Sequence, residues 1–223
     1  GAASMAMQML TKGSSQHTEA ELAEELDLYA ISLSGYSSSD SAAVVASCLT
    51  EHLERTLGLM SEVARTPTFS EDEFEKLRAQ TRAELALQSA EPSYIASREL
   101  DRKLFGQHPY SRTSTGELED VDALAIADLR SWWQQFVRPD MAVLILAGDV
   151  DQVRAMEAVR KILGDWQAEG PRPEIELPDF PESTPTHILL VNRPGSVQSQ
   201  IRVGQLGFSR KDPAYFTSVL VSD

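Results

Sequence analysis

The strongest constraint on the fold is a stretch dense in proline and acidic residues near the end of the chain. Five of the 11 prolines of this 223-residue chain lie between residues 169 and 185, with acidic side chains between them. Such a composition extends a backbone and does not pack it into a core. The stretch therefore predicts a linker over 169–185 between a domain over 1–168 and the beginning of a second domain over 186–223.

Hydrophobic periodicity predicts helices around a few strands. Two capping boxes, Thr18 to Glu21 and Ser70 to Glu73, mark helix starts. Apolar residues at helical spacing predict helices over 1–12, 18–29, 51–65, 70–89, 92–105, 122–136 and 151–164. Runs of β-prone residues predict a hairpin over 31–36 and 41–49, a buried strand over 141–147, and strands over 186–192 and 200–206 before a last helix from Asp212.

Charge and composition exclude several classes of function. The chain carries 20 Lys and Arg against 34 Asp and Glu, a net charge of −14. No stretch is basic enough to neutralise a row of phosphates, so we expect no nucleic-acid partner. No apolar run is long enough for a membrane span. The single cysteine, Cys48, excludes internal disulfides and thiolate clusters, and its apolar neighbours predict a packed core side chain.

No group of residues forms a complete catalytic motif. The four histidines, His17, His52, His108 and His187, lie far apart, and none has a metal-binding partner four residues later on one helix. The chain has neither a glycine-rich phosphate loop nor a Gly-x-Ser-x-Gly elbow. The serines at 37–39 are best explained as a polar hairpin turn.

Four strings in a fixed order carry a resemblance to a known family. The first is Gly-Ala-Ala-Ser-Met-Ala-Met-Gln-Met-Leu-Thr-Lys-Gly-Ser over residues 1–14, and the others are 69–75, 104–110 and 137–150. In this order and spacing the chain resembles the M16 metallopeptidases, the family of pitrilysin, insulinase and mitochondrial processing peptidase. The resemblance implies an α+β fold of M16 type (LuxS/MPP-like), an antiparallel sheet covered by helices, with the start of a second similar domain.

The resemblance also locates the positions where the family holds zinc. Members carry His-x-x-Glu-His on the first helix and a distant glutamate as third ligand. Here the histidine positions fall on Ser4 and Gln8, the general-base position on Met7, and the distant glutamate on Glu84. A hydroxyl and a carboxamide are poor zinc ligands, and a thioether cannot accept a proton from water. We therefore expect no catalytic residue, no metal and no cofactor, with Glu84 as a vestigial ligand position or simply a solvated or ion-paired helix residue.

The resemblance implies a non-catalytic subunit of a two-subunit M16 protease. Strand 31–36 aligns with the strand that lies along the bound peptide in active relatives, so Ser34, Gly35 and Tyr36 are the expected substrate-binding residues. Plain membership of the sheet is the alternative. The expected partners are an active homologue with intact His-x-x-Glu-His and a peptide. The net charge of −14 fits a basic peptide and equally fits simple solubility.

Two other functions stay open at this point. One is a purely architectural M16-like protein, of the type found as core subunits of respiratory complexes. The other is a fragment of an active zinc endopeptidase whose motif lies elsewhere in a longer chain. Family domains begin with strands that would precede Gly1, so we expect those strands to be absent from this sequence. For the compartment, the periplasm of a bacterium is favoured over the cytoplasm.

Overall fold

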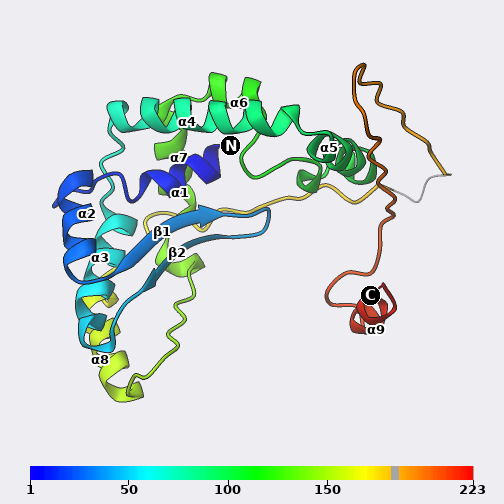
Figure 1. Ribbon diagram of the computed structural model, residues 1–223. Coiled ribbons are helices and arrows are strands. Elements are labelled where there is room, and N and C mark those ends of the chain that lie inside the picture. The colour runs from blue at the N-terminus through cyan, green and yellow to red at the C-terminus, as the bar shows by residue number, and fades with distance from the viewer. Residues whose placement is uncertain (182–185, 223) are drawn as a thin grey trace. The chain divides into compact units, whose positions relative to one another are not determined.

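The computed structural model describes residues 1–181 and 186–222 and is mainly helical (Figure 1). The chain divides into two compact units. Unit 1 consists of Gly1–Ala86 with Thr113–Ile175, and unit 2 of Leu87–Arg112 with Glu176–Asp223. The predicted linker carries no helix or strand over 169–181, and its residues 182–185 lie outside the described residues, as does position 223. The predicted domain boundaries stay a prediction.

Unit 1 begins with two short helices, α1 (Ala2–Met9) and α2 (Glu19–Leu28). The predicted capping box opens α2. The Thr18 hydroxyl accepts from the Glu21 N–H at 3.3 Å, and the Glu21 carboxylate accepts from the Thr18 N–H at 2.9 Å. The first helix is shorter than predicted, because the chain turns at Leu10 and leads into the loop over 11–18.

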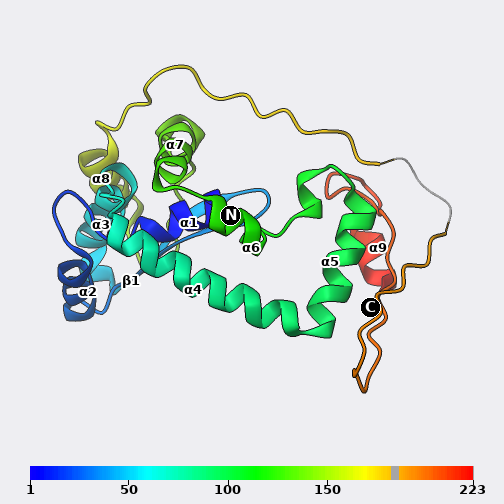
Figure 2. The same cartoon turned by 90° about the horizontal axis from the view of Figure 1, so that it is seen from above.

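The hairpin predicted from the sequence is confirmed. Strands β1 (Ser32–Ser37) and β2 (Ala42–Ser47) pair antiparallel, with Ser32 opposite Ser47 and Ser37 opposite Ala42. The Ser38 N–H donates to the Ser41 carbonyl at 2.7 Å, so the serine-rich segment is a tight polar turn. Helix α1 packs against this hairpin and against α7 (Figures 1 and 2).

The remaining helices that begin in unit 1 contribute to its core. They are α3 (Leu53–Arg65), α4 (Glu71–Ala90), α6 (Leu118–Ala123), α7 (Ile126–Phe136) and α8 (Gln152–Leu163), with 3-10 turns η1 (Thr50–His52) and η3 (Pro139–Met141). Helix α4 buries the four predicted side chains, Phe74, Leu77, Thr81 and Leu85. Cys48 packs partly buried against the core, as predicted.

The end of the helix predicted over 122–136 is confirmed, but its start is wrong. The chain forms α6 and α7 with a break at 124–125. The Asp128 carboxylate accepts from the Ala125 N–H at 2.8 Å and so caps a new helix start. The spacing of apolar residues does not reveal such a cap, so it predicts one continuous helix where the chain forms two.

The buried strand predicted over 141–147 is also wrong. This segment has no ladder partner in the described chain, and Val143 and Ile145 are 85% and 81% exposed. A strand becomes buried only when neighbouring strands pair with it and another layer covers it. Residues 141–147 are apolar, but no strand in the described parts of the chain pairs with them.

Unit 2 contains α5 (Pro92–Phe105), the turn η2 (Pro109–Ser111) and α9 (Tyr215–Ser222). The strands predicted over 186–192 and 200–206 are wrong, since both segments run extended without strand pairing and turn at 194–195. The last helix begins at Tyr215, three residues after the predicted Asp212, whose carboxylate accepts from the Ala214 N–H at 2.8 Å. Within residues 1–181 and 186–222, no helix is both long and apolar enough to span a bilayer.

Candidate functional site

Helix α1 carries the three positions where the resemblance places zinc binding and water activation. Ser4 and Gln8 lie one helical turn apart, and the Gln8 amide donates to the Ser4 hydroxyl at 3.2 Å and to the Ser4 carbonyl at 3.3 Å. Met7 is only 2% exposed and belongs to the hydrophobic core. The two ligand positions therefore satisfy each other, and the general-base position is an apolar core residue.

These three side chains do not fit a zinc ion. Zinc sites in proteins use imidazole, thiolate or carboxylate, and a hydroxyl paired with a carboxamide offers neither charge nor a strong lone-pair donor. Within the described parts of the chain, no three His, Cys, Asp or Glu side chains lie close enough together to hold a metal ion. The donor set on α1 is thus suited to packing and hydrogen bonding.

Glu84, the predicted vestigial ligand position, is an exposed residue of α4. Its carboxylate accepts from the Gln80 amide at 3.0 Å, an i to i+4 contact along the helix surface. The neighbouring Arg82 pairs with Asp122 and not with Glu84. The geometry of Glu84 is that of a solvated helix residue, and no contact joins it to Ser4 or Gln8 among the interactions of the described residues.

The predicted substrate-binding residues lie together on β1, where Ser34 and Tyr36 are exposed and Gly35 is buried. The hydrogen bond from the Ser38 N–H to the Ser41 carbonyl shows which main-chain groups of β1 face β2. The N–H and C=O groups of successive residues point to opposite edges of an antiparallel strand. Residues 32, 34 and 36 point their N–H and C=O groups at β2. The N–H and C=O groups of Leu33, Gly35 and Ser37 point at the opposite edge, where no described strand pairs with them.

One face of the hairpin is open and uncharged. Side chains alternate between faces, and the face away from α1 carries Ser32, Ser34 and Tyr36 from β1, with Val45 and Ser47 from β2. Tyr36 and Val45 are about half exposed, at 51% and 48%. On the covered side, the Ser37 hydroxyl oxygen is buried and has no hydrogen-bond partner among the described residues. An unsatisfied buried hydroxyl is unusual and indicates a place where a bound group could complete the hydrogen bonding.

Glycine at position 35 is required by the contact between β1 and α1. A Cβ added at Gly35 would overlap the carbonyl oxygen of Met7. Strand and helix backbones therefore touch at this point, as only glycine permits. The contact joins the strand predicted to bind peptide directly to the helix that carries the degenerate zinc positions.

A polar cluster around His17 was not predicted from the sequence. His17 Nδ1 lies 2.8 Å from a Glu62 carboxylate oxygen, and Nε2 lies 3.1 Å from a Glu25 oxygen. The hydrogen bond that the His17 ring donates to the Glu62 carboxylate raises the pKa of His17 above its ordinary value, and the nearby Glu25 charge acts in the same direction. Glu62 is 45 residues away from His17 in sequence, so no local spacing could have revealed this contact.

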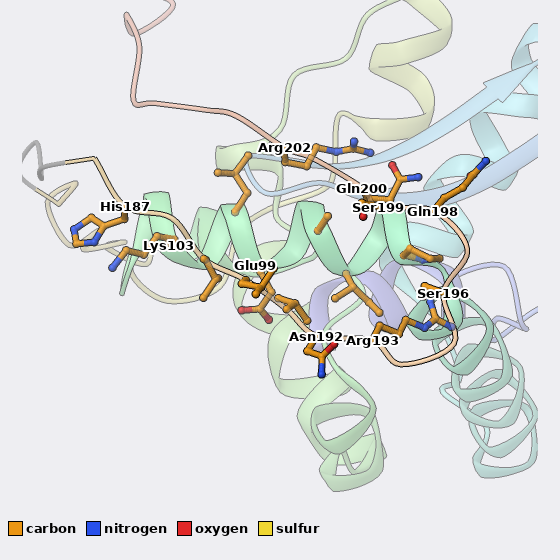
Figure 3. A pocket seen from close by; sticks show the side chains of 17 residues that line it. Glu99, Lys103, His187, Asn192, Arg193, Ser196, Gln198, Ser199, Gln200 and Arg202 are labelled. Carbon is orange, nitrogen blue, oxygen red and sulfur yellow. The ribbon is translucent and has the colours of Figure 1, made fainter.

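Unit 2 contains a cavity of about 380 Å³ beside α5 (Figure 3). One wall is the face of α5 that carries Ile95, Glu99 and Lys103, and the other is the extended chain over 187–202. None of the predicted site residues lines it. The cavity is therefore separate from the features of α1 and β1.

Comparison with known proteins gives a consistent result over both parts of the chain. Residues 1–117 match the profile of the family described as Insulinase (Peptidase family M16), and residues 123–223 match that of the Peptidase M16 inactive domain.

Relatives of similar sequence carry related descriptions. The uncharacterized zinc protease YmxG of Bacillus subtilis is 24% identical over 172 residues, which are 77% of this chain and 42% of the relative. The non-peptidase homolog YmxG of Helicobacter pylori is 24% identical over 150 residues, 67% of this chain and 35% of the relative. The beta subunit of the mitochondrial-processing peptidase of Caenorhabditis elegans is 23% identical over 165 residues, 74% and 36% of the two chains. The chain thus spans less than half the length of these relatives.

Solved structures confirm the predicted fold class. A peptidase M16 inactive domain from Pseudomonas fluorescens superposes with a TM-score of 0.70 at 24% identity, covering 78% of this chain and 42% of that chain. The first half of the periplasmic protease PqqL from Escherichia coli gives 0.69 at 18% identity, covering 78% and 39%. With one family profile matching more than half of its residues and a second profile of the same family matching residues 123–223, the chain belongs to the M16 peptidase family.

Proposed function

We propose that this chain is part of a non-catalytic M16 subunit that binds an extended peptide along the free edge of β1 and supports a catalytically competent partner. The observation that carries the proposal is the unpaired edge of β1, where the main-chain groups of Leu33, Gly35 and Ser37 face away from β2. A peptide strand added there would gain main-chain hydrogen bonds that do not depend on its side chains.

The residues of α1 support the proposal of a non-catalytic subunit. Ser4 and Gln8 bond to each other, and Met7 is packed in the core, so none of the three can activate a water molecule. The description of the Helicobacter pylori relative as a non-peptidase homolog supports such a role in this family. The open face of Ser32, Ser34 and Tyr36 has no charge, and it would leave space for peptide side chains that alternate across the added strand.

The supporting role rests on substrate orientation. A subunit that binds and aligns a peptide can raise the turnover of a partner by orders of magnitude without a catalytic group of its own. Completion of a binding chamber around the peptide would act in this way, and it requires only surfaces, which the loss of the zinc ligands leaves intact.

A proline substitution at the free edge of β1 tests peptide binding. Ser37→Pro removes an N–H that faces the edge and leaves the β2 ladder intact, because that N–H makes no bond to β2. We expect affinity for a fluorescent basic peptide of about ten residues to fall about fivefold, the effect of one hydrogen bond. Ser37→Ala keeps the N–H and serves as the control. Equal affinity of both variants for the peptide would show that the peptide does not bind along the edge of β1.

Titration into an active M16 homologue tests the supporting role. The longer protein that contains this chain is expected to form a complex on size exclusion and to raise cleavage of a quenched peptide until the two are equimolar. A flat response with no complex would favour the architectural function instead.

A further inference from the structure

His17 has a carboxylate at each of its two ring nitrogens. Nδ1 lies 2.8 Å from Glu62 on α3, and Nε2 lies 3.1 Å from Glu25 on α2. A neutral imidazole has one N–H and one lone pair, so it can donate to only one of these carboxylates and must face the other with its lone pair. Only the imidazolium form, with a hydrogen on both nitrogens, satisfies both contacts.

The other charged and polar groups around His17 agree with a positive charge at this point. From α2, the carboxylates of Glu21 and Glu25 face the ring, and from α3 Glu62 does so. Arg55 of α3 donates to the second oxygen of Glu25 at 2.8 Å. The Glu62 side chain is 6% exposed and that of Glu25 is 18% exposed, so solvent screens these contacts only weakly.

The cluster is structural in geometry and not a catalytic triad. A serine nucleophile would have to donate to the imidazole, whereas the Ser14 hydroxyl donates to Glu62. The same Ser14 oxygen accepts from the main-chain N–H groups of Gln16 and His17 at 3.1 and 2.9 Å. The cluster therefore shapes the loop over 13–18, which connects α1 with α2.

His17 joins three elements through one side chain. Its own loop begins just after α1, Glu25 lies on the second half of α2, and Glu62 lies near the end of α3. Leu22 is the only fully buried side chain of α2, and Leu26 packs partly buried against the core. A helix with one fully buried side chain also depends on the polar contacts that hold it.

We propose that His17 is a pH-sensitive latch, which in its doubly protonated form holds α2 against α3 and which releases α2 when one ring nitrogen loses its proton. The pKa of His17 is raised by the Glu62 hydrogen bond. A raised pKa in the folded protein means that the latch contributes fully below the ordinary histidine pKa of about 6.5 and is lost as the pH rises through the folded value.

Hydrogen exchange and histidine titration on the 223-residue chain test the latch. As the pH rises through the titration of His17, we expect the α2 amides to exchange about fourfold faster, beyond the intrinsic chemical increase, which is the effect of one weakly screened ion pair. In His17→Gln the α2 amides should exchange fast at every pH, without a step. His187→Gln, at an exposed histidine of unit 2, is the control and should behave as the wild type.

A second variant keeps the test decisive if His17→Gln fails to fold. Glu25→Gln retains the hydrogen bond from His17 to the Glu62 carboxylate but removes the other carboxylate charge, so the NMR titration of His17 should move to lower pH and the exchange step should move with it. A His17 titration at or below its ordinary pH in the wild type would overturn the proposal. An exchange rate in α2 that passes through the titration without a step would do the same.

Discussion

Gly35 and Met7 touch through their backbones, and any side chain at position 35 would overlap the Met7 carbonyl oxygen. This contact fixes β1 against α1. The strand proposed to bind peptide and the helix with the degenerate zinc positions are therefore in direct backbone contact. Changes in either element are expected to affect the other.

The contact predicts a strong effect of a very small substitution. Gly35→Ala should destabilise the protein by about 1–3 kcal/mol, because the new methyl group forces the helix and strand apart. Gly58 in the middle of α3 is the control, since a Cβ there meets no atom within 4 Å. Gly58→Ala should stabilise by about 0.5–1 kcal/mol through helix propensity. Urea unfolding of the two variants measures both, and a neutral Gly35→Ala would contradict the contact.

The donor set of α1 predicts how zinc binding could be restored. Elemental analysis after dialysis should find no stoichiometric zinc in the wild type, whereas Ser4→His with Gln8→His should bind zinc weakly through two imidazoles one turn apart. Adding Glu84→Gln to this double variant tests whether Glu84 acts as third ligand, in which case binding is lost. One zinc per wild-type chain would contradict the account.

Restoring the general-base glutamate at position 7 should also lower the stability of the protein. Met7 is a core residue, so Met7→Glu places a carboxylate among apolar side chains and should destabilise by roughly 2–4 kcal/mol in the absence of metal. Zinc added to the Ser4→His, Gln8→His, Met7→Glu variant should recover part of this loss, and thermal unfolding with and without zinc measures the recovery. Met5→Glu, at another buried methionine of α1, is the control. It should lose as much stability, and adding zinc should not restore any of it.

The contacts of Arg138 predict where a protease can first cut the predicted linker. Its guanidinium donates to the carbonyls of Glu169, Gly170 and Pro171 at 2.8–3.0 Å and forms a two-pronged pair with Asp140, which holds the pKa of Asp140 below its ordinary value. Arg138→Lys keeps the charge but loses the fork. A glutamate-specific protease should then cut after Glu169 in the variant and mainly after Glu174 or Glu176 in the wild type.

Arg154→Lys, at an exposed arginine of α8, is the control for this digestion and should leave the wild-type pattern unchanged. Identical patterns for Arg138→Lys and the wild type would show that the carbonyl contacts do not hold the chain.

Local patterns predicted the elements that local interactions build. The buried side of α4 follows from apolar spacing, the start of α2 from the Thr18 capping box, and the hairpin from β-prone runs around a serine turn. Each of these depends on residues that lie within one helix or one hairpin, where even the outermost pair, Ser32 and Ser47, is close in sequence. The apolar run over 141–147 differs from these elements, because it would need a distant strand beside it to become buried.

The site shows the same division. The degenerate character of Ser4, Met7 and Gln8 could be recognised from residue type, because it concerns the chemistry of three side chains on one helix. The backbone contact of Gly35 with Met7 and the pairing of His17 with Glu62 join positions 28 and 45 residues apart, and only the folded chain brings them together. Such tertiary contacts leave no local signal in a single sequence.

The most direct test of the proposed function is residue-resolved hydrogen exchange of β1 with and without an excess of the basic peptide. The account predicts that the amides of Leu33, Gly35 and Ser37, which face the free edge, become protected when the peptide binds, while those of Ser34 and Tyr36, already bonded to β2, do not change. Protection of neither set, or of Ser34 and Tyr36 alone, would contradict peptide binding along this strand.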